Sequence, residues 1–238
     1  MDGFLGPEAL CDERTLGFAF PTQIAHDRMR RAFRDGLDTA GVPYRWGDSE
    51  SGLEFLRRHE AVFCPSFEFM EESLQRALAE YLQLGGIVVM GPEVPTRGET
   101  MRESAILDDF TARPVHKLDG PVDTLVFNAG AGRLVLLTDI IDPGTDTAQE
   151  SVAAIVSFLR IAPLFPVTAP CDRSVFRYGD RTLVFLANPT DNDQRPRVTV
   201  GGATRLFDWW TGEEFVGTGQ VPVAMRPWQV RAMEVAPC

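Results

Sequence analysis

The chain has 238 residues, of which 44% are hydrophobic and 24% charged, as is typical of a globular protein with one large domain or two ordinary ones. Its formal net charge of −11, with no stripe of Lys and Arg to offset it, argues against nucleic acid as a partner. No apolar run approaches the roughly 20 residues that span a bilayer, and the acidic start MDGFLGPEALCDER is unlike a signal peptide. We therefore expect a cytoplasmic protein with no membrane partner.

Strand and helix patterns alternate in the first part of the chain. A helix is predicted with Met29, Phe33, Leu37 and Ala40 on one face, and Gly41 follows where a helix end favours a left-handed residue. Three strands are expected around it: TLGFAF (15–20), VPYRW (42–46) and a third within EAVFCPSF (60–67).

The same alternation continues to about residue 163. A helix with the apolar stripe Leu74, Leu78, Tyr81 and Leu82 leads through two glycines to the strand IVVM (87–90). TLVFN (124–128) and GRLVLLTD (132–139) are predicted as strands, and a capping box over residues 147–150 is expected to open the last helix. This order predicts an α/β fold, a flavodoxin-like parallel sheet with helices on both faces.

The stretch YLQLGGIVVMGPEVP (81–95) has the glycines of a nucleotide-binding loop in the wrong order. A dinucleotide fingerprint places glycines after a strand and before a helix, whose N-terminus binds the phosphate. Here the helix precedes Gly85 and Gly86, so they lie at the negative end of its dipole. We interpret the stretch as a structural joint and expect no cofactor.

The pattern changes at the proline-rich segment IAPLFPVTAP (161–170), which is predicted to be a linker. Beyond it the apolar residues alternate with period two, and Gly179-Asp180 has the composition of a two-residue hairpin turn. The sequence thus predicts two domains: an α/β domain over residues 1–163 and a small antiparallel β-sandwich over 164–238.

Cys64 is the one candidate nucleophile, because it lies near the end of a predicted strand, where open α/β sheets place their active sites. His116 is the only later histidine that could serve as its base. However, Cys64 lacks the flanking glycines of a nucleophile elbow, and we favour a small buried hydrophobe over a catalytic thiol. The four cysteines and three histidines do not have the spacing of a metal site, so neither a metal nor a disulfide is expected.

Exposed tryptophans stack on sugar rings or anchor protein interfaces, and four are candidates: Trp46, Trp209, Trp210 and Trp228. Trp209 and Trp210 precede a Thr-Gly turn, and we expect one to fill the sandwich core while the other covers its edge. Trp46 precedes Gly47, and packing is favoured over a place in a cleft.

Two stretches carry a resemblance. VFCPSFEFMEESLQRALAEYLQLGGIVVMGPEVP (62–95) resembles the trimerisation domain of family 42 β-galactosidases, which has the fold of class I amidotransferases without their catalytic triad. The segment from RTLVFLANPT (181–190) through DWWTGEEF (208–215) to the last strand is similar to the small β-sandwich that closes many such glycosidases.

The resemblance implies a non-catalytic region for oligomerisation and support, with a trimer as the favoured assembly. Members of this family carry their catalytic glutamates on a (β/α)8 barrel, which needs about 250 residues and has no counterpart here. The resemblance also implies a galactoside as substrate of the parent enzyme and a barrel domain or chain as partner. Two alternatives stay open: a small amidotransferase-like hydrolase using Cys64, and a carbohydrate-binding module using exposed tryptophans.

Overall fold

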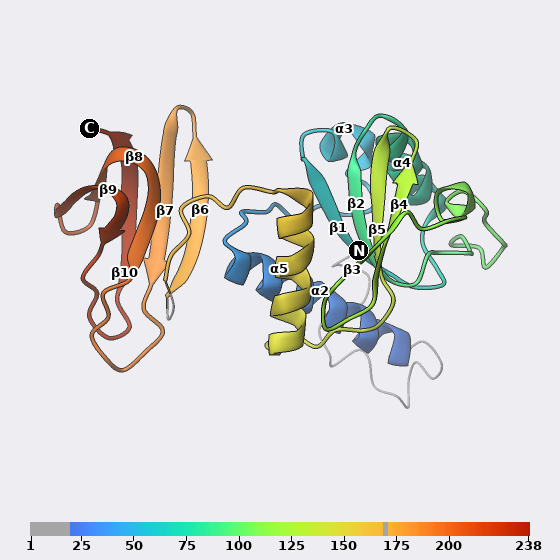
Figure 1. Cartoon of the computed structure of the whole chain (residues 1–238), viewed down its shortest axis with the longest axis horizontal. Coiled ribbons are helices and arrows are strands. Elements are labelled where there is room, and N and C mark those ends of the chain that lie inside the picture. Colours follow the sequence, from blue (N-terminus) through green and yellow to red (C-terminus); the bar gives the residue numbers. More distant parts are fainter. Residues whose placement is uncertain (1–19, 169–170) are drawn as a thin grey trace. The chain divides into compact units, whose positions relative to one another are not determined.

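The computed structural model describes residues 20–168 and 171–238. The chain divides into two compact units, one made of the residues up to Gly36 with Arg45–Leu159, the other of Leu37–Tyr44 with Arg160–Cys238 (Figure 1). The expected strand TLGFAF lies outside the described residues, except for Phe20, which begins a helix.

The first unit is built on a five-stranded sheet in the order β1-β2-β5-β4-β3. Its strands are β1 (Ala61–Ser66), β2 (Ile87–Pro92), β3 (His116–Leu118), β4 (Thr124–Ala129) and β5 (Gly132–Leu137). β1, β2 and β5 run parallel, whereas β4 pairs antiparallel with both β5 and β3. The sheet is therefore mixed and not parallel throughout, because the two residues between β4 and β5 allow only a hairpin.

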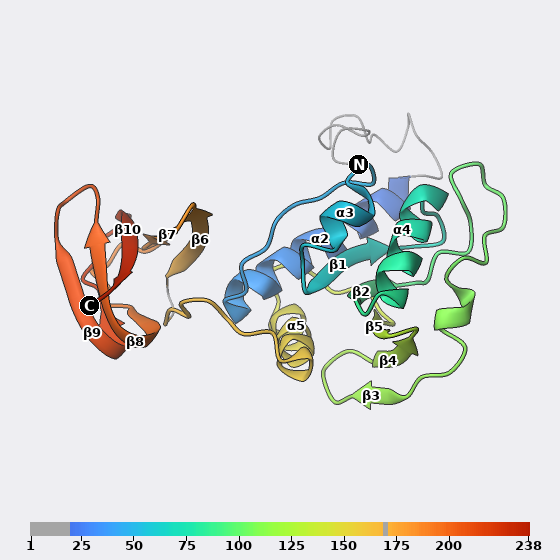
Figure 2. The same ribbon diagram turned by 90° about the horizontal axis from the view of Figure 1, so that it is seen from above.

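Helices cover both faces of this sheet. They are α2 (Phe20–Ala40), α3 (Gly52–Leu56), α4 (Glu72–Gln83) and α5 (Asp146–Leu159), with the short 3-10 helix η3 (Asp108–Phe110). Leu78 and Leu82 of α4 pack with Val88 and Met90 on one face. On the other face Phe33 of α2 contacts Phe63 of β1 edge to face, with ring centroids 5.6 Å apart. Figures 1 and 2 show α5 beside α2.

Two local predictions in this part of the chain are wrong. Residues 42–46 form no strand, because the Val42 amide donates to Leu37 O and the Gly41 amide to Asp38 O. These two bonds, with Gly41 at φ +77°, make the Schellman motif that ends α2. The predicted capping box of α5 is also shifted, since the Ala148 amide donates to Thr145 Oγ1 and not to Thr147.

The second unit is all-β, with one antiparallel sheet in the order β6-β7-β10-β8-β9. Its strands are β6 (Asp172–Tyr178), β7 (Arg181–Ala187), β8 (Arg197–Asp208), β9 (Glu214–Pro222) and β10 (Val230–Pro237). The pairing of β8 with β9 shifts register between Val200 and Thr204, which interrupts the alternation of period two within β8. The buried residues of β7, β8, β9 and β10 form one core cluster, distinct from that of the first unit.

Candidate functional site

The carboxyl ends of β1 and β2 are the part of the first unit where an α/β enzyme would place its chemistry. Here the loops that follow the two strands are tied to each other. Ser66, 1% exposed, accepts a hydrogen bond from the Gly91 amide at 3.1 Å and donates one to Glu93 O at 2.6 Å. A serine with both bonds inside the scaffold is a structural group and not a nucleophile.

Gln75 of α4 holds the two loops from beneath. Its side chain is fully buried, and Nε2 donates to Met70 O at 2.7 Å and to Arg97 O at 3.0 Å. Its Oε1 accepts from Ser104 Oγ at 2.8 Å. One amide therefore fixes the segments 67–71 and 93–104, which we call the locked loop pair.

The locked loop pair presents apolar side chains to solvent. Phe69 is 42% exposed and Met101 is 53% exposed, the latter with a left-handed backbone at φ +63°. Arg97 bridges the pair, because its side chain bonds Glu68 Oε1 at 2.7 Å and Met101 O at 3.1 Å. An exposed aromatic ring on a rigid support is typical of a contact surface.

The N-terminus of α4 is the usual place for an anionic ligand in such a sheet. It is already occupied by the chain itself, since Glu99 Oε2 accepts a hydrogen bond from the Glu72 amide at 2.9 Å. This backbone hydrogen bond holds the pKa of Glu99 below its usual value. At the other end of the helix, Gly85 at φ +98° links α4 to β2, in agreement with its interpretation as a joint.

Cys64 lies in β1 with its side chain packed among the hydrophobic groups under α4. Burial raises the pKa of its thiol to about 12, so at neutral pH the thiolate needed for catalysis is almost absent. His116 lies in β3, at the opposite edge of the sheet. Four interstrand spacings of about 4.8 Å each separate the two strands, so the side chains are not brought together.

All four tryptophans are exposed. Trp46, 52% exposed, has the Arg30 guanidinium 5.5 Å from its ring centroid. Trp209 and Trp210 are 45% and 62% exposed, so the expectation that one of them fills the core is wrong. Trp228 is 64% exposed at φ +56°, and its indole N–H donates to Asp191 at 2.8 Å.

Trp210 belongs to a row of aromatic rings on the second unit. Phe185 of β7 makes edge-to-face contacts with Phe176 of β6 at 5.4 Å and with Trp210 at 6.3 Å between ring centroids. Phe176 is 56% exposed. The indole N–H of Trp209, the preceding residue in sequence, donates to Glu234 at 3.0 Å, which fixes the orientation of that ring.

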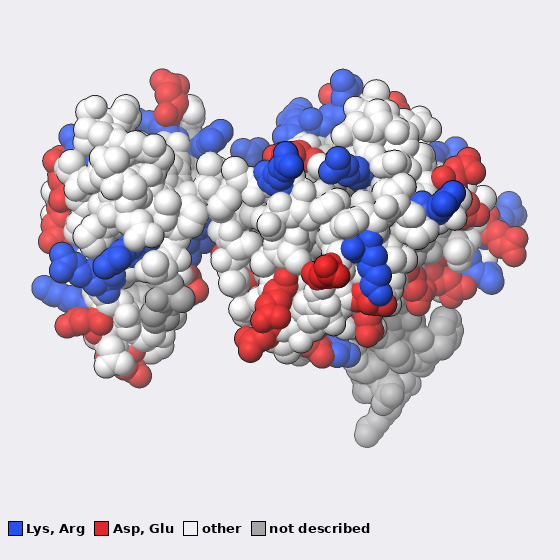
Figure 3. Space-filling view, in the orientation of Figure 1, with Lys and Arg blue, Asp and Glu red and all other residues white. Residues whose placement is uncertain are grey.

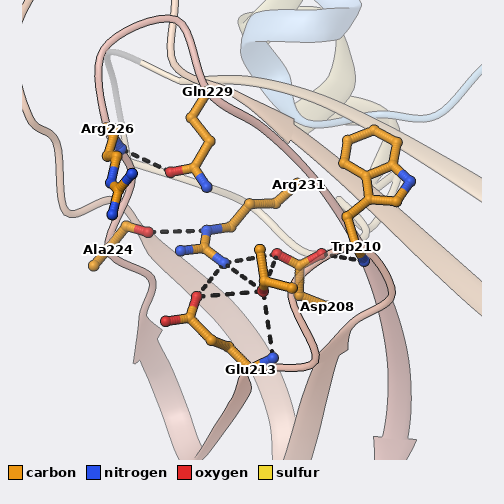
Figure 4. A network of polar contacts seen from close by, with 8 residues as sticks. Asp208, Trp210, Glu213, Ala224, Arg226, Gln229 and Arg231 are labelled. Atoms are coloured by element: carbon orange, nitrogen blue, oxygen red, sulfur yellow. Dashed lines mark hydrogen bonds and ion pairs between the residues drawn. The ribbon is translucent and has the colours of Figure 1, made fainter.

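A buried ion pair holds the turn that carries Trp210 (Figure 4). Asp208 and Arg231 have 0% and 6% of their side-chain surface exposed, and Asp208 Oδ2 lies 2.6 Å from Arg231 Nη1. Glu213 Oε2 lies 2.5 Å from the same nitrogen, and Thr211 Oγ1 donates to Asp208 at 3.0 Å. Burial alone would raise the pKa of Asp208, but hydrogen bonds from the Trp210 amide and from Arg231 outweigh it and lower the pKa.

The described residues supply no catalytic constellation that we can assemble. They contain no group of three His, Cys, Asp or Glu side chains placed to hold a metal ion. In the same residues, no helix is long and apolar enough to cross a membrane.

The sequence did not single out Gln75, Ser104 or Arg231. Gln75 carries a signal that could have been used, because it lies three residues before Leu78 and thus on the buried stripe of α4. Arg231 is 23 residues from Asp208, and nothing local links them.

Comparison with known proteins places these surfaces in context. The family described as "GLMA-like, second domain" matches residues 19–126, and no curated protein matches the chain in sequence. Gan42B, a GH42 β-galactosidase from G. stearothermophilus, superposes with a TM-score of 0.71 at 14% identity, over 95% of this chain and 38% of that one. A β-galactosidase from Bacillus circulans sp. alkalophilus gives 0.66 at 14% identity, over 89% of this chain and 38% of its own.

The exo-carrageenase GH42 from Bacteroides ovatus is also similar, with a TM-score of 0.51 at 15% identity, over 87% of this chain and 26% of that one. At such identities the likeness concerns the fold alone. The chain spans 38% of the length of the two β-galactosidases. The resemblance inferred from the sequence is confirmed: residues 19–126 match the GLMA-like second domain, and the chain has the fold of one region of family 42 β-galactosidases.

Proposed function

We propose that this chain is the oligomerisation and support region of a β-galactosidase-like glycoside hydrolase in the cytoplasm. Catalysis would take place on a (β/α)8 barrel that is not among these 238 residues and that acts on a galactoside. The proposal includes a flavodoxin-like, class I amidotransferase-like fold for the first domain, a β-sandwich fold for the second and a domain boundary near residue 163. Neither a cofactor nor nucleic acid takes part.

The observation that carries this proposal is the locked loop pair. At the edge where an α/β enzyme has its reactive groups, this chain has tied its polar groups to one another and left Phe69 and Met101 exposed. That arrangement supports a contact with a second copy of the chain better than it supports chemistry. In a closed cyclic trimer this surface of each copy would meet a different patch of the next copy, and the same contact would occur three times.

The test is solution mass by light scattering over a concentration series, for the chain and for Phe69→Glu. We expect a trimer that the variant dissociates, because a buried unpaired carboxylate is strongly unfavourable in an interface. Leu84→Glu is the matched control, since Leu84 is 57% exposed and lies between α4 and the amino end of β2, whereas Phe69 follows the carboxyl end of β1. A chain that stays monomeric at its highest soluble concentration would refute the proposal.

A second candidate function, carbohydrate binding, is favoured by the aromatic row of Phe176, Phe185 and Trp210. Rings on one sheet face with a carboxylate nearby suit the apolar face and hydroxyl groups of a sugar. Galacto-oligosaccharide should then change the tryptophan fluorescence of the chain, and Trp210→Ala should abolish the effect. Trp228→Ala removes an equally exposed indole elsewhere and should leave it intact; an unchanged spectrum would exclude this candidate.

A further inference from the structure

The second unit has a shallow hollow at the start of the β8–β9 ladder, lined by Arg195, Arg197, Gln220 and Pro222. Arg197 pairs with Pro222 and Thr199 with Gln220 in the strand register. The residues between them, Pro196, Val198 and Val221, are buried. All four lining side chains therefore project from the same outer face of the sheet.

The two arginines have no acidic partner. In the described part of the chain, neither guanidinium forms an ion pair, and the position opposite Arg197 in the ladder is the neutral Pro222. Farther along the same ladder Arg205 is paired with Glu214 at 3.2 Å. The hollow is thus an uncompensated positive site on a chain of net charge −11. On the face drawn in Figure 3, several basic side chains of the second unit lie together.

The backbone beneath the hollow is held in place. The Arg197 amide donates to Thr168 Oγ1 at 2.9 Å, and the Thr168 amide donates to Arg197 O at 3.2 Å. The Val223 amide donates to Pro196 O at 2.9 Å, on the side of β9. The two arginines therefore leave the sheet from fixed points two residues apart, a spacing of about 7 Å along an extended strand.

Two guanidinium forks at this spacing match one ligand chemistry. Each fork offers parallel N–H donors to the two oxygens of a carboxylate, sulfate or phosphate group. Gln220 adds an amide that can donate to, or accept from, a hydroxyl beside that group. Because the overall field of the chain repels anions, local contacts must supply the attraction.

We propose that this hollow binds the carboxylate or sulfate group of an acidic sugar. The oxyanion part of the proposal rests on the two unpaired arginines, and the sugar part rests on the proposed function in carbohydrate metabolism. The site is separate from the aromatic row and from the locked loop pair in the residues that form it.

The experiment is isothermal titration and NMR of the whole labelled chain with four probes: galacturonate oligosaccharide, sulfated galacto-oligosaccharide, neutral galacto-oligosaccharide and inorganic sulfate. We expect saturable binding of the acidic sugars, with shifts at the Gln220 amide and the two arginine side chains. Arg197→Ala should weaken it at least tenfold. Arg197→Lys keeps the charge but loses the fork, and it should restore only part of the affinity.

Arg205→Ala is the matched control, because it removes the same charge from the same ladder outside the hollow. Equal weakening by Arg205→Ala would refute the site and leave only a general electrostatic effect. Binding of the neutral sugar alone, or of no probe, would also refute it. Inorganic sulfate binding as tightly as the sugars would overturn the sugar part alone. A trimer that does not bind acidic sugars would refute this inference and leave the proposed function standing. A monomer that binds acidic sugars would refute the proposed function and leave the binding site standing.

Discussion

At the scale of single residues, the ion pair of Asp208 with Arg231 is the most consequential arrangement in the second unit. Both charges are buried, so each depends on the other and on the hydrogen bonds around it. Together they position the turn that carries Trp209 and Trp210. The stability of this unit should therefore depend on pH through Asp208.

Asp208→Asn removes the negative charge and leaves Arg231 buried without its main partner. We expect a loss of about 3 kcal/mol in the free energy of unfolding at pH 7, as is usual when one side of a buried pair is removed. The pKa of Asp208 is lowered in the folded state, so its contribution is present above the unfolded pKa and is lost as pH falls through the folded pKa. Urea titrations should show that the difference in free energy of unfolding between the unsubstituted chain and Asp208→Asn disappears below about pH 4. A difference that does not change with pH would contradict this.

At the scale of elements, the joint between α4 and the β4–β5 hairpin depends on a close backbone approach. A Cβ at Gly132 would lie 2.1 Å from Gly86 O and 2.6 Å from Leu82 O. Backbone atoms cannot move aside as a flexible side chain can. No other residue fits at the start of β5 without moving the helix or the strand.

Gly132→Ala should therefore destabilise the first unit by more than about 2 kcal/mol, through overpacking against backbone. Gly201→Ala is the matched control, because a Cβ there meets nothing within 4 Å. Chemical denaturation of both variants measures the difference. Equal stability of the two would show that the contact at Gly132 relaxes easily.

Sequence reasoning succeeded at this scale where the cause is local. The apolar stripes of α2 and α4 and the Gly41 helix end follow from periodicity and backbone preference. The predictions from sequence were wrong where the local structure depends on residues that are distant in the chain. Residues 42–46 have strand-like composition, yet no neighbouring strand takes them up. Likewise, the exposure of Trp209 and Trp210 is decided by which strands cover the core.

At the scale of the whole molecule, each unit has its own core cluster. The change of period near residue 163 predicts two domains, because the two periodicities belong to different layer architectures. The functional surfaces could not be predicted in the same way. Gln75, Ser66 and Ser104 become a lock only when loops nearly 30 residues apart meet.

Two separate cores predict thermal unfolding in two steps, each sensitive to a different substitution. Gln75→Ala leaves Ser104 Oγ and Met70 O without the partner that Gln75 gives them, and Arg97 O keeps only the Met70 amide, so the free energy of unfolding of the first unit should fall by about 3 kcal/mol. Asp208→Asn should lower only the other transition. Scanning calorimetry of both variants and of Gln83→Ala, an exposed residue on the same helix as Gln75, measures this. A single transition lowered equally by both core variants would contradict it.

The carboxylate of Glu99 at the start of α4 has a further consequence. It acts as a ligand tethered to its own receptor, and a short tether gives such a group a high effective concentration. A free anion must displace it before reaching the helix dipole, and ordinary cellular concentrations compete poorly with an intramolecular group. The helix N-terminus thus holds the loop in place, and removal of the Glu99 side chain would open it to a free anion.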